Sequence, residues 1–140
     1  MKRIVCLVVC CALAGCGLLA PDLVSRGVYR LEAAEVGSCR LVITAAAEAG
    51  RLLVEGVLTG KGRFPYPLAA EAVVSLVASD GSELKRTRAA LRRSRVRRGG
   101  GTHAYFTAGF DRIPPAGTLI RVRPPSPDVP IPGCGKPAGG

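Results

Sequence analysis

The feature that most constrains the fold of this chain is a succession of short β-forming runs separated by glycine, proline and aspartate. The runs cover residues 28–33, 39–44, 52–58, 72–78, 93–97, 104–110 and 118–122. Apolar and polar side chains alternate most clearly in the sixth run, as in a half-buried strand. One face of that strand would carry Ala104, Phe106, Ala108 and Phe110. About seven short strands with this punctuation predict an all-β fold, a small antiparallel β-sandwich or barrel.

The connections between these runs support the same fold class. The Ser-Asp-Gly-Ser sequence at 79–82 is typical of a hairpin turn, because glycine tolerates the positive φ that such a turn requires. Residues 83–98 are ambiguous, because residues 89–91 would suit a helical turn while residues 95–97 alternate like a strand. We interpret this stretch as a strand that ends at the three glycines 99–101. An immunoglobulin-like or transthyretin-like sandwich, or a barrel, accommodates these strands.

The first fifteen residues have the layout of an export signal. Lys2 and Arg3 precede an apolar run over residues 4–14. A helix that spans the hydrocarbon layer needs about 20 apolar residues, so this run is too short for a membrane span. We therefore predict that residues 1–15 are a signal peptide, which is removed from the mature protein.

The sequence Leu13-Ala14-Gly15-Cys16 at the end of this signal resembles the lipobox of bacterial lipoproteins. The resemblance implies that the Cys16 thiol, a strong nucleophile as thiolate, receives a diacylglycerol and becomes the lipidated N-terminus after cleavage. Where this family carries aspartate for inner-membrane retention, the chain has Gly17. That difference implies an outer-membrane anchor that faces the periplasm. The alternative is an ordinary secretory signal whose cysteine falls at the cleavage point.

The mature chain divides into a tether, one domain and a tail. We expect residues 16–26 to form the lipidated N-terminus and tether, residues 27–123 the β-sandwich, and residues 124–140 a tail rich in proline and glycine.

Apart from the signal and the lipidated cysteine, the cysteines are Cys39 and Cys134. An even pair in an oxidising compartment favours one disulfide, which would return the tail to an early strand. Two unpaired thiols are the alternative, since the sequence does not show that they approach each other.

The positive charge of the chain is concentrated in one short stretch. The formal net charge is +10, or +8 without the two basic residues of the signal, and residues 85–98 carry eight basic side chains and no acidic one. The predicted partner-binding residues are Arg86, Arg88, Arg92, Arg93, Arg95, Arg97 and Arg98. On a strand, Arg93, Arg95 and Arg97 would share one face. Because the arginine fork suits carboxylates and phosphates, the expected partner is an acidic protein surface, anionic lipid or lipopolysaccharide; a solvated strand face is the alternative.

No pattern in the sequence predicts catalysis, a metal site or a cofactor other than the covalent lipid on Cys16. His103 is the only histidine, so neither a Ser-His-Asp triad nor a histidine-based metal site can be assembled. The glycines at 99–101 lack the lysine and hydroxyl residues of a phosphate-binding loop. Few aromatic residues accompany the arginines for base stacking, and an outer-membrane anchor separates the protein from nucleic acid. We therefore expect a protein that is not an enzyme and does not bind nucleic acid.

Residues 53–122 resemble the YbaY/YscW lipoprotein family, which includes pilotins of type III secretion systems. Residues 54–57 resemble the opening strand of that family, and residues 67–76 resemble its Pro-Leu entry into the second strand. Residues 104–110 resemble its aromatic-containing strand, and residues 113–122 the following turn and strand. The likeness implies a noncatalytic β-sandwich.

This resemblance also implies a role. The protein would be an outer-membrane lipoprotein that acts as a binding or assembly factor, a pilotin that binds a secretin subunit and carries it to the outer membrane. The alternative is a basic envelope module that binds lipopolysaccharide or anionic lipid through residues 85–98. Ionic strength distinguishes the two, because a contact with lipid phosphates weakens steeply with salt, whereas strand addition or groove binding retains main-chain and apolar contacts.

Overall fold

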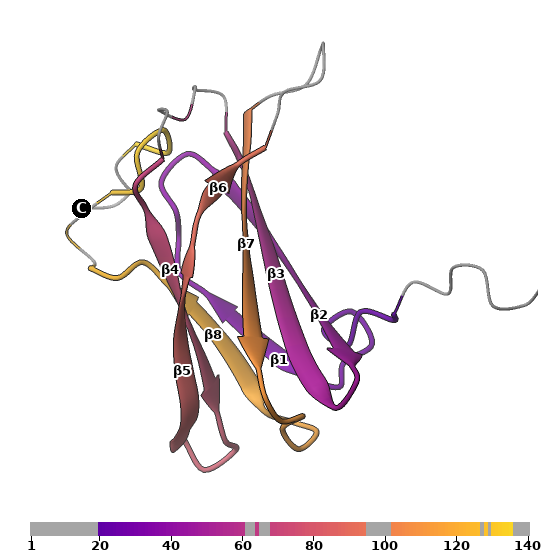
Figure 1. Cartoon of the computed structure of the whole chain (residues 1–140). Helices are drawn as coiled ribbons and strands as arrows, with labels where there is room; N and C mark the ends of the chain where they lie inside the picture. Colours follow the sequence, from indigo (N-terminus) through magenta and orange to yellow (C-terminus); the bar gives the residue numbers. More distant parts are fainter. Residues whose placement is uncertain are drawn as a thin grey trace, which may run out of the picture.

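The computed structural model describes residues 20–60, 64, 68–94, 102–126, 128 and 130–135. The predicted signal peptide and Cys16 therefore lie outside the described residues. The strands are β1 (Arg30–Ala33), β2 (Arg40–Glu48), β3 (Arg51–Gly60), β4 (Glu71–Val77), β5 (Glu83–Ala90), β6 (Arg92–Arg93), β7 (Thr102–Phe110) and β8 (Leu119–Arg123). This part of the chain contains no helix, so the predicted all-β class is confirmed (Figure 1).

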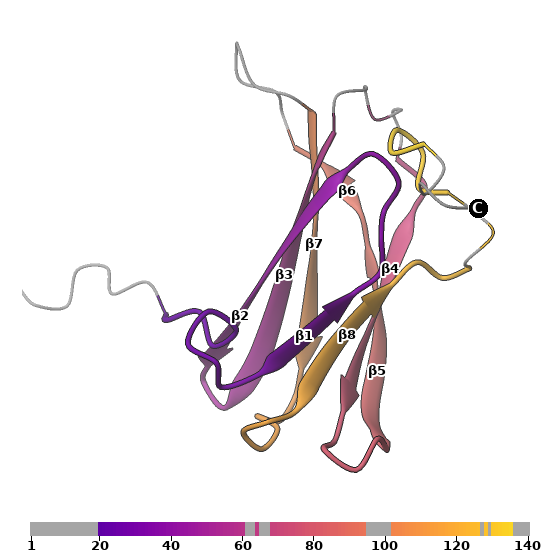
Figure 2. The same ribbon diagram turned by 180° about the vertical axis from the view of Figure 1, so that it is seen from behind.

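Two four-stranded sheets face each other, which confirms the predicted sandwich. One sheet has the order β1-β8-β4-β5 and the other the order β2-β3-β7-β6. Neighbouring strands are antiparallel in both sheets except β1 and β8, which run parallel and lie side by side in the foreground of Figure 2. A parallel pair needs a long connection, and here the rest of the sandwich lies between β1 and β8 in sequence.

The core lies between the two sheets and follows the period-two alternation of the strands. β3 contributes Leu52, Val54 and Leu58, and β4 contributes Val74 and Leu76. The residues predicted to share one face of β7 are all buried, each at most 2% exposed: Ala104, Phe106, Ala108 and Phe110. The alternation in that run therefore predicted the buried face correctly.

Gly56 of β3 allows the Phe106 ring to pack across the sheet. The two residues are paired in the register of β3 and β7, and a Cβ atom on Gly56 would overlap the Phe106 ring. Gly56→Ala should therefore destabilise the domain by about 1–3 kcal/mol, the usual cost of overpacking a core. Chemical denaturation measures this loss in the free energy of unfolding.

Gly109→Ala in β7 is the matched control for that variant. Its added Cβ would meet Arg51 Nη2 at 3.6 Å and Leu53 Cδ2 at 3.7 Å, which are ordinary van der Waals contacts. We expect no loss of stability, because replacing an unstrained glycine by alanine even stabilises by about 0.4–1 kcal/mol through the unfolded chain. Equal losses in the two variants would show that overlap with the Phe106 ring is not the cause.

The described part of the basic stretch, residues 83–94, contains two strands, whereas a single strand was predicted for residues 83–98. β5 belongs to the first sheet and β6 to the second, with Leu91 between them. Leu91 is 3% exposed, and its N–H donates to the Ala70 carbonyl at 2.8 Å. This buried residue marks a corner at which the chain passes from one sheet to the other. Residues 95–101, with the expected strand end and glycine loop, lie outside the part described.

The N-terminal segment joins the sandwich before the expected domain boundary at residue 27. The Asp22 carboxylate accepts a hydrogen bond from the Ala45 N–H at 3.0 Å, and the Leu23 N–H donates to the Ala45 carbonyl at 2.7 Å. Burial raises the pKa of the Asp22 carboxyl, but hydrogen bonds from the backbone of Ala45, Val24 and Ser25 outweigh it, so the pKa lies below its ordinary value. The ionised Asp22 thus occupies the edge of β2.

Residues 130–135, which were expected to belong to an extended tail, contact the domain. Cys134 is fully buried and forms a disulfide with Cys39, their Cα atoms 5.0 Å apart. The Ser38 N–H and hydroxyl both donate to the Cys134 carbonyl, at 2.6 and 2.7 Å, and Ile131 packs into the core. These contacts fix the described C-terminal residues against the sandwich.

Candidate functional site: an arginine-lined groove

The arginines predicted to form one partner-binding surface are divided between the two sheets. Arg86 and Arg88 belong to β5, whereas Arg92 and Arg93 form β6 at the edge of the other sheet. The remaining predicted residues lie outside the described part of the chain: Arg95, Arg97 and Arg98. The predicted common face of the odd-numbered arginines from 93 to 97 therefore remains a prediction.

Two arginines from β8 complete a site with those of β5. In the register of the sheet, two residues of β4 each have an arginine on either side: Arg86 and Arg121 flank Ser75, and Arg88 and Arg123 flank Val73. Residues two apart on a strand share a face, so the four arginines stand on the outer face of this sheet. They line a groove of about 200 Å³ together with Val73, Ser75, Glu83, Pro124 and Pro125. We call it the arginine groove.

Small side chains of β4 lie beneath the arginines. Ser75 is only 4% exposed although it points away from the core. Long arginine side chains cover such a residue with their aliphatic stems and keep their charged ends in water. The side chains of Arg86 and Arg88 are accordingly 62% and 69% exposed. The groove therefore presents guanidinium groups to solvent above a small, shielded floor.

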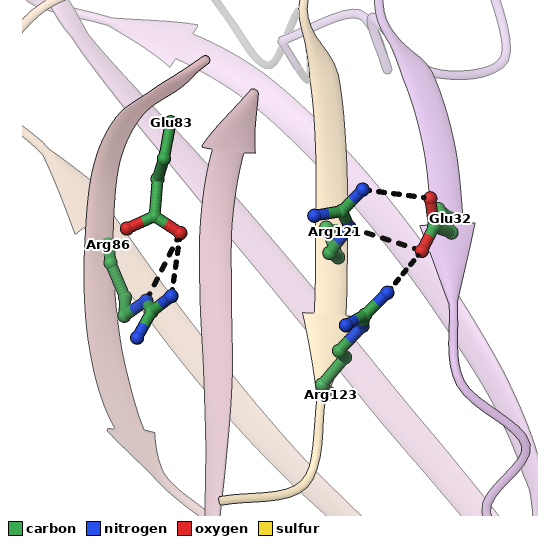
Figure 3. A network of polar contacts seen from close by, with 5 residues as sticks. All are labelled: Glu32, Glu83, Arg86, Arg121 and Arg123. Atoms are coloured by element: carbon green, nitrogen blue, oxygen red, sulfur yellow. Dashed lines mark hydrogen bonds and ion pairs between the residues drawn. The ribbon is translucent and has the colours of Figure 1, made fainter. Parts of the chain in front are cut away.

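Glu32 of β1 bridges the two arginines of β8 (Figure 3). Its Oε1 accepts hydrogen bonds from Arg123 Nη2 at 2.8 Å and Arg121 Nε at 3.1 Å, and its Oε2 accepts one from Arg121 Nη2 at 3.4 Å. The hydrogen bonds from Arg123 and Arg121 hold the pKa of the Glu32 carboxyl below its ordinary value. Glu32 is thus ionised at neutral pH and orients one side of the groove.

The arginines of β5 also have carboxylate partners. Glu83 Oε2 accepts hydrogen bonds from Arg86 Nε and Nη2 at 3.2 and 2.8 Å (Figure 3), and Glu71 lies 3.6 Å from Arg88. Residues 85–98 contain no acidic side chain in sequence, but the fold brings glutamates from elsewhere in the chain to the groove. Four arginines and three glutamates leave this surface only weakly positive.

The contribution of β8 was missed in the sequence because it depends on which strands are neighbours. Alternation in the predicted strand 118–122 places Arg121 on the solvent-facing side, and Arg123 follows in phase. That signal shows exposure only. The pairing of β8 with β4, which brings these arginines to those of β5, joins segments far apart in sequence.

Some of the basic residues also have a purely structural explanation. β5 and β6 are edge strands, and lysine or arginine on an edge strand discourages pairing with other chains. This accounts for Arg92 and Arg93, which are exposed. It does not account for Arg121 and Arg123, because β8 is an interior strand between β1 and β4.

His103, the only histidine of the sequence, lies in β7 outside the arginine groove. His103 Nδ1 lies 3.0 Å from Thr59 Oγ1 in the pairing of β7 with β3. Within the described ranges, no group of three or more His, Cys, Asp or Glu side chains is placed to hold a metal ion. The same ranges contain no helix long and apolar enough to cross a membrane.

Comparison of the chain with known protein families, with characterised proteins and with solved structures finds no match. The resemblance of residues 13–16 to a lipobox, and that of residues 53–122 to the YbaY/YscW family, therefore remain predictions from the sequence.

Proposed function

We propose that this protein is an outer-membrane lipoprotein that binds a protein partner on the periplasmic side, as a noncatalytic assembly factor. Attachment through Cys16 is proposed from the lipobox-like residues 13–16. The observation that carries the binding role is the arginine groove, because edge protection does not require the arginines of the interior strand β8. The YbaY/YscW resemblance suggests a secretin subunit as the partner and piloting as the role.

The mixed charge of the groove supports a protein partner. Arg86, Arg121 and Arg123 each donate to a glutamate on the same face. A partner protein can present carboxylates to the arginines and basic groups to the glutamates, so that both signs of charge are matched. An anionic membrane surface offers one sign only, and the glutamates would repel it.

Binding of lipopolysaccharide or anionic lipid is the second candidate function. It is favoured by Arg92 and Arg93, for which no ion pair occurs among the residues that the structure describes. Exposed arginines without carboxylate partners suit phosphate groups. The two functions therefore use different arginines, and substitutions can separate them.

Neutralising the β5 side of the groove tests the proposed function. In Arg86→Gln/Arg88→Gln, capture of the partner from envelope membranes should fall about tenfold or more, because two charged contacts at the interface are removed. Glutamine avoids adding carboxylates beside Glu83 and Glu71. The melting temperature should stay close to the parent's, since exposed substitutions alter stability by about 0.5 kcal/mol or less. Quantitative mass spectrometry of proteins captured by the lipidated bait gives the measurement.

Arg92→Gln/Arg93→Gln is the matched control, with two charges removed outside the groove. We expect it to capture the partner as the parent does. If lipid binding is the function, this variant should instead lose binding to lipopolysaccharide-containing vesicles, and the parent's binding should weaken between about 0.01 and 0.15 M salt, where the Debye length falls from about 30 to 8 Å. Parent-like capture by both variants would mean that the arginines are a solvated surface.

A further inference from the structure

An apolar hollow adjoins the arginine groove. It measures about 620 Å³ and shares Pro125 with the groove. Its lining is mostly apolar and includes Leu68, Ala69, Ala70, Ala90 and Ile131. We call it the apolar hollow. A ligand that lies in the groove would therefore meet an apolar surface at one end.

The apolar hollow continues the arginine groove along the same face of β4. Three successive pairs across β4 and β5 mark the direction: Glu71 with Ala90, Val73 with Arg88, and Ser75 with Arg86. The first pair lines the hollow and the other two line the groove. Pairs two residues apart succeed one another at about 7 Å along a strand. This face thus offers the position of Ala90, with Glu71 beside it, followed by two arginine positions at regular spacing.

The arginines of the groove retain hydrogen-bond donors for a ligand. Each guanidinium has five N–H donors. Arg86 and Arg121 each direct two nitrogens at a glutamate, and Arg123 directs one. Arg88 lies 3.6 Å from Glu71, beyond the range of a good hydrogen bond. The existing ion pairs therefore orient the guanidinium groups and leave some of the N–H donors of each group available to a ligand.

We infer that the groove and the hollow form one docking channel for an extended segment of the partner protein, with an apolar side chain in the hollow and acidic side chains two and four residues further along. This inference rests on the proposed function and adds the chemistry of the partner. In an extended segment, alternate side chains share one face and repeat at about 7 Å, which matches the spacing along β4. Charge complementarity identifies the acidic positions, because the arginine fork binds carboxylates in a bidentate manner.

An anionic lipid fits the same channel less well. Its acyl chain would lie in the hollow and its phosphate in the groove, but Glu71 lines the hollow and Glu32 and Glu83 flank the arginines. These carboxylates repel a phosphate group and its neighbours in a membrane more than they repel single, separated carboxylates. The observations therefore favour a polypeptide segment as the occupant.

Two synthetic peptides test this channel. The first carries a leucine followed by aspartates two and four positions later, with threonines between them, and the second has asparagines in place of the aspartates. With the mature lipidated protein in detergent, fluorescence anisotropy should show about tenfold tighter binding of the acidic peptide. Arg88→Gln/Arg123→Gln should abolish that preference. Ala90→Gln, which fills the hollow without adding charge, should weaken the binding of both peptides and preserve the preference for aspartate.

A control variant and two contrary results distinguish failure of the docking channel from failure of the proposed function. Arg92→Gln/Arg93→Gln should bind both peptides as the parent does. Equal binding of the two peptides by the parent would overturn the channel; if the groove variants still lose their partner from membranes, the proposed function stands without it. Displacement of the acidic peptide by inorganic phosphate or phosphatidylglycerol vesicles, at equal concentrations of anionic groups, would also overturn it, because the preferred occupant would then be a phosphate.

Discussion

The Cys16→Ser protein is expected to lose its lipid-mediated attachment to the membrane. The proposed lipid is joined through a thioether, which the serine hydroxyl cannot form. The variant should therefore remain an unprocessed precursor or appear in the soluble fraction, without an acyl label. Membrane fractionation and metabolic labelling with a fatty-acid analogue measure these two results independently.

Cys10→Ser is the matched control for this experiment. It exchanges sulfur for oxygen within the apolar run 4–14, away from the residues that resemble a lipobox. We expect this variant to be cleaved, labelled and retained in the membrane. Unchanged attachment and acyl labelling of Cys16→Ser would contradict the lipid anchor and, with it, the proposed outer-membrane location.

The expected size of the effect follows from the number of acyl chains. A buried methylene contributes about 0.8 kcal/mol, yet one myristoyl chain gives only marginal binding, so stable attachment takes two chains. A diacylglycerol with an added N-acyl chain exceeds that requirement. The tether is also short: Asp22 is fixed to Ala45, and six extended residues reach only about 20 Å. Under the proposed anchor, Asp22 and the edge of β2 to which it is bonded stay close to the membrane surface.

The fold class could be predicted because burial of one strand face leaves a visible alternation in sequence. The pattern at Ala104, Phe106 and Ala108 identified the inner face of β7 correctly. The single strand predicted for residues 83–98 was wrong at Leu91, a buried residue at which the chain changes sheets. Alternation reports which side of a strand is buried, but it does not report which sheet the strand belongs to.

The candidate site was harder to predict from the sequence than the fold, because it depends on contacts between segments that are distant in sequence. Arg86 and Arg88 stood out through local charge density, whereas Arg121 gained its importance from the pairing of β8 with β4. The partner of both β8 arginines, Glu32, comes from the parallel strand β1 at the other end of the domain sequence. Neither the pairing of β8 with β4 nor that of β8 with β1 can be predicted from the composition or residue spacing of a single sequence.

Loss of the disulfide between Cys39 and Cys134 is expected to destabilise the domain more than any other substitution considered above. The two cysteines are 95 residues apart in sequence, and the chain-entropy argument gives about 4–5 kcal/mol for a loop of this size, with measured losses of about 2–5 kcal/mol in small secreted domains. Cys39→Ser/Cys134→Ser should lower the free energy of unfolding by this amount in chemical denaturation. In the parent protein, both thiols should resist alkylation until they are reduced.

Ser38→Ala separates the disulfide from the other contacts of the C-terminal segment. It removes the hydroxyl donor to the Cys134 carbonyl and should cost about 1 kcal/mol, as for a typical hydrogen bond. A double-cysteine variant no less stable than Ser38→Ala, or alkylation of the oxidised parent, would contradict the role of the bridge.

Because Pro130, Ile131 and Pro132 line the apolar hollow, loss of the bridge should also weaken binding of the leucine-containing peptides. The preference for aspartate should persist, since β4, β5 and β8 hold the arginines in place without the C-terminal segment.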